Sequence, residues 1–221
     1  FKQKTAYEIR PRDWSSDVCS SDLVWALSRG LIIKWYPACW STHRATSGVI
    51  ALVKEHNLKP SDIATIEVDL RLIPLLYTKP GTGLEGKFSM AFNNALGVLK
   101  GWSEIPDYTA GRTQEPAVRA VMQKLKHVDD PADGSVQVTI VTSDGRRLPK
   151  NVMHAPGAPT WGLQEERTLN KYRGCAAYRL SPEQVQSVEH DLLNLETVKD
   201  LVPLVNALAG SKQAARQTVP A

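Results

Sequence analysis

Apolar side chains recur at helical spacing in several stretches of the chain. The first stretch covers about residues 42–57, and Ser41 and Thr42 just before it are suitable N-cap residues. The same spacing predicts five further helices, at about residues 87–99, 115–125, 163–177, 182–193 and 196–209. Six helices are therefore expected along the chain.

A second pattern, strict alternation of apolar and polar residues, predicts strands. Residues 63–72 alternate in this way, and residues 136–141 and 147–153 flank the hairpin dipeptide Asp144-Gly145. Pro149 cannot donate a hydrogen bond from its nitrogen, so it should place its strand at a sheet edge. We therefore predict an α+β fold with a small three-stranded antiparallel sheet and packed helices.

Residues 34–43, KWYPACWSTH, combine an extended approach, a turn and a helix start. The free N–H groups of a helix N-terminus attract anions, and Lys34 and His43 flank this one. Together they suggest a site for a carboxylate or a phosphate. The alternative is a surface lysine, a half-buried histidine and an ordinary helix cap.

A glycine-rich stretch before the next helix offers a second anion-binding arrangement, with Lys87 and Ser89 at the helix start. The alternative is that Gly83 and Gly86 serve only the turn. In that case Lys87 pairs with Glu85 or a more distant carboxylate.

Composition narrows the class of protein. The 221 residues carry a net charge of +4, and the basic residues are scattered, which argues against a nucleic-acid surface. No apolar run approaches the roughly 18 residues of a membrane span. Cys39 and Cys175 are isolated, so they give neither a zinc signature nor a disulfide framework. A reducing cytoplasm is the simplest interpretation.

Three ordered sequence blocks resemble the MmgE/PrpD family, which includes 2-methylcitrate dehydratase, cis-aconitate decarboxylase and iminodisuccinate epimerase. The first block is KWYPACWSTHRA, which begins at residue 34, and the second is GLEGKFSM, which begins at residue 83. The third is KYRGCA from residue 171, followed by LSPEQ from residue 180. The resemblance covers only the C-terminal part of the family's chain. It implies that residues 24–159 form the α+β domain and that the helices of residues 160–210 return to an all-helical N-terminal domain, which is missing here.

The resemblance also implies a reaction and site residues. A 2-methylcitrate dehydratase-like enzyme eliminates water from a hydroxy-tricarboxylate without a metal or other cofactor, and the full-length protein is expected to be a cytoplasmic homodimer. Lys34, Lys87 and Ser89 would bind substrate, His43 would act in catalysis, and Cys39 would line the pocket where some relatives carry a histidine. Phe92 stands where decarboxylase-like members carry a tyrosine, which disfavours decarboxylation.

The chain ends invite a separate interpretation. Residues 2–9 and 13–23 back-translate to index-primer and adaptor oligonucleotides of high-throughput sequencing, so we interpret residues 1–23 as translated adaptor rather than native protein. Residues 211–221 are expected to be a disordered tail. A fragment of this kind should be inactive alone. The alternatives are an epimerase or decarboxylase of a related acid, and a non-catalytic module for anion binding or dimerisation.

Overall fold

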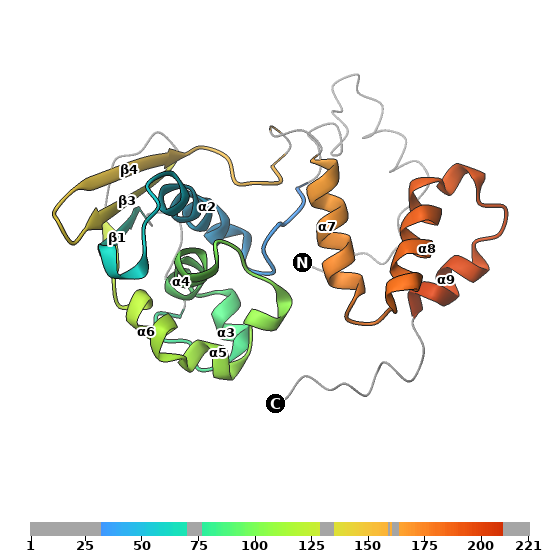
Figure 1. Ribbon diagram of the computed structural model, residues 1–221, viewed down its shortest axis with the longest axis horizontal. Helices are drawn as coiled ribbons and strands as arrows, with labels where there is room; N and C mark the ends of the chain where they lie inside the picture. The colour runs from blue at the N-terminus through green and yellow to red at the C-terminus, as the bar shows by residue number, and fades with distance from the viewer. Residues whose placement is uncertain (1–31, 70–76, 129–134, 159, 161–163, 210–221) are drawn as a thin grey trace, which may run out of the picture. The chain divides into compact units, whose positions relative to one another are not determined.

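The computed structural model describes residues 32–69, 77–128, 135–158, 160 and 164–209 (Figure 1). The interpretations of residues 1–23 and 211–221 concern segments outside the described residues. Within the described part no helix is long and apolar enough to cross a membrane.

The sheet has four strands, in the order β2-β1-β3-β4. They are β1 (Ile63–Asp69), β2 (Leu125–Val128), β3 (Val136–Thr142) and β4 (Arg147–Val152). The β1–β3 and β3–β4 pairs are antiparallel, but β1 and β2 run parallel. The α+β class is confirmed, and the three-stranded antiparallel sheet is wrong. The strand that sequence reasoning missed, β2, has only four residues, and its burial does not alternate.

The predicted hairpin is confirmed. Gly145 has φ of 86°, the left-handed conformation that a tight turn between β3 and β4 requires. Pro149 lies in β4 opposite Thr139, and among the described strands β4 pairs with β3 alone. The expected edge position of this proline is therefore also confirmed.

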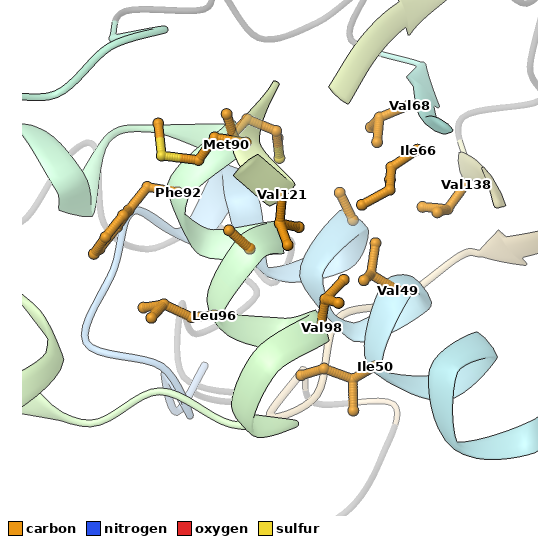
Figure 2. Packing of buried hydrophobic residues seen from close by; sticks show 14 of the residues in the cluster. Val49, Ile50, Ile66, Val68, Met90, Phe92, Leu96, Val98, Val121 and Val138 are labelled. Atoms are coloured by element: carbon orange, nitrogen blue, oxygen red, sulfur yellow. The ribbon is translucent and has the colours of Figure 1, made fainter. Parts of the chain in front are cut away.

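Helix α2 (Trp40–Glu55) packs against β3 and β4. Gly48 permits this close contact, since a Cβ there would lie 3.0 Å from a methyl carbon of Val138. Helix α4 (Met90–Lys100) packs in turn against α2 and α6 (Pro116–Met122) (Figure 1). The core fills the space between these elements, as Figure 2 shows for Val49, Ile66, Val138, Phe92, Leu96 and Val121.

Two helix boundaries differ from the predictions. Helix α2 begins at Trp40 with Cys39 as its N-cap, so Ser41 and Thr42 lie within its first turn. The Thr42 hydroxyl donates to the Cys39 carbonyl oxygen at 2.8 Å. The helix predicted over residues 87–99 begins later, as α4 at Met90, and a short helix, α3 (Gly83–Lys87), precedes it. The predicted helix over residues 115–125 corresponds to α6, which follows α5 (Ala110–Gln114) and ends before β2.

The C-terminal helices are α7 (Glu165–Ala176), α8 (Pro182–Leu193) and α9 (Val202–Ala209). They share a small core of Leu180, Val185, Val188 and Leu204. Several large apolar side chains around α8 and α9 stay exposed, namely Leu192, Leu193, Leu195, Leu201, Val202, Val205 and Leu208. The helix predicted over residues 196–209 is shorter, since α9 begins at Val202 and Pro203 lies in its first turn, where proline is tolerated.

Candidate functional site

The two segments that the sequence singled out meet through their backbones. The N–H of Cys39, the N-cap of α2, donates to the carbonyl oxygen of Lys87 at 2.8 Å. Lys87 is the last residue of α3, so the end of α3 lies against the beginning of α2. The structure thus brings Cys39 and Lys87 together, and Lys34 lies exposed in the approach to α2.

The N-terminus of α2 carries no side-chain cap. Cys39 has the extended conformation of an N-cap residue, with φ of −60° and ψ of 132°, but its side chain accepts no hydrogen bond. The first turn also contains no acidic residue. The positive end of this 16-residue helix is therefore not compensated by a side chain of its own.

The glycine-rich stretch before α3 is already satisfied by the chain itself. The Glu85 carboxylate accepts the N–H groups of Gly81 at 2.6 Å and of Thr82 at 3.2 Å. The Thr82 hydroxyl in turn accepts the N–H of Glu85 at 3.2 Å, which completes a capping box. A carboxylate of the chain therefore occupies the place that sequence reasoning offered to a bound anion.

Lys87 does not pair with Glu85, and within the described residues it has no carboxylate partner. Its side chain is half-buried, and Nζ lies 6.0 Å from the centre of the Tyr108 ring. A cation at this distance from an aromatic face is attracted by the ring without being neutralised. No carboxylate of the described residues therefore neutralises the charge of Lys87.

Ser89 has a structural part in the fold. Its side chain is fully buried, and its Oγ accepts the N–H of Phe92 at 3.2 Å as the N-cap of α4. Its predicted contact with substrate stays a prediction. Cys39, in contrast, is half-buried with a free thiol.

His43 is fully buried in the first turns of α2, between the rings of Tyr36 and Trp40, each with its centre 5.0 Å away. Burial lowers the pKa of His43 to about 4, although the Ala38 carbonyl opposes this shift. Neither ring nitrogen makes a hydrogen bond of normal geometry within the described part of the chain. The imidazole is therefore neutral at pH 7. Its predicted catalytic role stays a prediction.

Sequence reasoning missed a buried polar network beside Lys87. Asn93 and Tyr108 are joined by a hydrogen bond of 2.6 Å from the tyrosine hydroxyl, and Ser103 lies 3.1 Å from the same hydroxyl. The available signal was the pair Asn93-Asn94 within an otherwise apolar helix, because amides are rarely buried without partners. Nothing local in the sequence pointed to Tyr108.

The described residues contain no cluster of three or more histidine, cysteine, aspartate or glutamate side chains that could hold a metal ion.

Comparison with known proteins agrees with the motifs. Mouse cis-aconitate decarboxylase is 24% identical over 203 residues, a match that covers 85% of this chain and 41% of that enzyme. The chain thus spans well under half the length of this curated relative. The sequence model of the MmgE/PrpD C-terminal domain matches residues 36–195, which include the N-termini of α2 and α3, the sheet, α7 and α8. The chain therefore belongs to the MmgE/PrpD family.

Proposed function

We propose that this chain is the substrate-holding part of an MmgE/PrpD-type lyase and that its ligand is a small hydroxy-tricarboxylate such as 2-methylcitrate. One observation carries the proposal: the uncapped N-terminus of α2 is bonded through Cys39 to Lys87, whose amine has no carboxylate partner in the described residues. Lys34 adds a second exposed cation in the approach to the same helix. Open N–H groups and cations together suit carboxylates.

The proposed reaction is elimination of water. A general base takes the proton beside a carboxylate, the electrons of that C–H bond form the new C=C bond, and the β-hydroxyl leaves with a proton from a general acid. Negative charge develops on the carboxylate during proton removal, so lysines that hold it also stabilise the transition state. In this proposal Lys34 and Lys87 hold the carboxylates, and the base comes from chain outside this sequence.

Decarboxylation is the second candidate, because the relative found is named a cis-aconitate decarboxylase. Phe92 weighs against it here. Its side chain is fully buried, and its ring packs edge-on against Tyr108 with centres 5.7 Å apart. A phenylalanine has no hydroxyl to donate a proton, so any such role of a tyrosine at this position is lost.

The exposed apolar side chains of α8 and α9 support a further part of the proposal. We propose that these helices pack against the remainder of a longer protein, because isolated helices with a bare apolar face gain little stability in water. The match to only 41% of the mouse relative is consistent with such a remainder.

Binding tests the proposal directly. We expect the purified chain to bind 2-methylcitrate in a calorimetric titration, and Lys34→Met or Lys87→Met to weaken binding about 10-fold each, the effect of one charged hydrogen bond. Lys54→Met is the matched control, because this exposed lysine lies in the last turn of the same helix.

Two results would contradict the proposal. One is a Lys54→Met variant that binds as weakly as the other two; the other is a wild-type chain that binds neither 2-methylcitrate nor cis-aconitate. Turnover is expected only when the complete gene is expressed, and its product is then assayed against both acids.

A further inference from the structure

The buried side chain of Asn93 makes two hydrogen bonds to the backbone of the turn that carries Lys87. The amide nitrogen of Asn93 donates to the carbonyl oxygens of Gly86 at 3.0 Å and Ser89 at 2.7 Å, the residues on either side of Lys87 and Phe88. Both acceptors are backbone carbonyls, so only the NH₂ group of the amide can face them. Asn93 is 1% exposed, and water does not replace these bonds.

Tyr108 fixes the remaining side of that amide. Its hydroxyl donates to Asn93 Oδ1 at 2.6 Å. The hydroxyl has only one proton, so the Ser103 hydroxyl, 3.1 Å away, is the donor to Tyr108. Burial raises the pKa of Tyr108, which keeps the phenol protonated as this chain of hydrogen bonds requires.

Two more contacts join Tyr108 to α3, the helix that ends at Lys87. A Cβ at Gly83 in α3 would lie 1.8 Å from the Tyr108 carbonyl oxygen, so the tyrosine backbone rests directly on that glycine. The ring also lies 6.0 Å from the Lys87 amine. Tyr108 thus contacts the beginning of α3, the cation at its end and, through Asn93, the turn that follows.

We propose that Asn93 and Tyr108 are positioning residues that hold Lys87, and through its carbonyl the N-terminus of α2, in the geometry for binding a carboxylate. The link to α2 is the bond from the Cys39 N–H to the Lys87 carbonyl oxygen. The inference rests on the proposed function, in which Lys87 binds the substrate.

The test compares two neighbouring asparagines of α4. Asn93 and Asn94 are both 1% exposed, but the side-chain Oδ1 of Asn94 accepts from the Thr46 hydroxyl on α2. Among the described residues its side chain makes no hydrogen bond to the turn of residues 86–89. Asn93→Ala and Asn94→Ala should both destabilise the fold. At matched stability, only Asn93→Ala should speed hydrogen exchange of the Cys39 amide, by about 10-fold, the effect of one buried hydrogen bond.

Tyr108→Phe is the milder variant, because it removes the hydroxyl and keeps the ring beside Lys87. We expect it to weaken 2-methylcitrate binding about 5-fold and to speed Cys39 exchange, while Tyr178→Phe, at an exposed tyrosine, changes neither. Unchanged Cys39 exchange in both Asn93→Ala and Tyr108→Phe would overturn the inference. Faster exchange in a chain that binds no polyacid supports the positioning and instead refutes the proposed function.

Discussion

The N-termini of α2 and α3 differ in whether a side chain caps them. Each begins with N–H groups that need acceptors. Helix α3 supplies them from its own sequence, through Thr82 and the Glu85 carboxylate. Helix α2 has Cys39 at the corresponding position, with no acceptor side chain and no acid in its first turn.

This difference in capping indicates which of the two helix N-termini is the better candidate for binding a ligand. A missing N-cap costs about 1 kcal/mol of stability. Side chains cap α3, α4, α5 and α8, whereas α6 and α2, the longest helix among the described residues, have no side-chain cap. The N-terminus of α3 is capped by Thr82 and Glu85, which stabilises the fold. In the proposed function, the anion binds at the uncapped N-terminus of α2, beside Lys87, whose amine has no carboxylate partner among the described residues.

The largest expected effect concerns His43, which lies at the uncapped end of α2. Its pKa of about 4 lies below the ordinary value of 6.5, so between these values the unfolded chain binds a proton and the folded chain does not. Stability should therefore fall as the pH falls from about 6.5 to about 4, by about 1.4 kcal/mol per pH unit.

Urea unfolding of wild type and His43→Leu over this pH range isolates the effect. The leucine variant should lose this part of the slope, whereas His56→Gln, at an exposed histidine just beyond the end of the same helix, should keep it. Equal slopes in wild type and His43→Leu would show that His43 is not held neutral by burial.

The second effect comes from opening α3. Glu85→Ala removes the carboxylate that accepts from Gly81 and Thr82, and we expect a loss of about 1 kcal/mol in the free energy of unfolding. Added sulfate should then stabilise the variant more than wild type, because an anion can take the vacated place. Thermal unfolding with and without sulfate measures this stabilisation. Identical increases in melting temperature for both proteins would show that the N-termini of α2 and α3 differ in more than a cap.

The smallest effect comes from closing α2. Cys39→Asp places a good cap residue at a position whose backbone is already extended, so stability should rise by about 0.5–1 kcal/mol. The same carboxylate should weaken 2-methylcitrate binding, since it competes for the open N–H groups. Chemical denaturation and calorimetric titration give the two values. Stabilisation with unchanged binding would separate the α2 entrance from the ligand.

The sheet shows which parts of the fold could be predicted. The β3–β4 hairpin is encoded locally by alternation around Asp144-Gly145, and its prediction is confirmed. Strand β2 pairs in parallel with β1, more than fifty residues earlier, and its four residues directly follow a helical pattern. Such a strand exists because β1 offers it a free edge, and no local pattern records that edge.

The site divides in the same way. Lys34 and Lys87 were predicted because each stands beside a recognisable turn or helix start, and Cys39 was predicted from the family resemblance. The capping box Thr82-x-x-Glu85 is also local, and its spacing could have shown that the α3 entrance is closed. The bond from Tyr108 to Asn93 crosses fifteen residues between a loop and a helix, so it is fixed only when the core packs.

The parallel pairing of β1 with β2 also shapes how the chain folds. The hairpin can close early, since its strands are neighbours in sequence, whereas the parallel β1–β2 pair joins strands more than fifty residues apart and should form later. Lys87, Asn93 and Tyr108 all lie between these two strands in the sequence. The turn that carries Lys87 and the edge strand β2 should consequently form together late in folding, so a partly folded chain should lack the proposed carboxylate site.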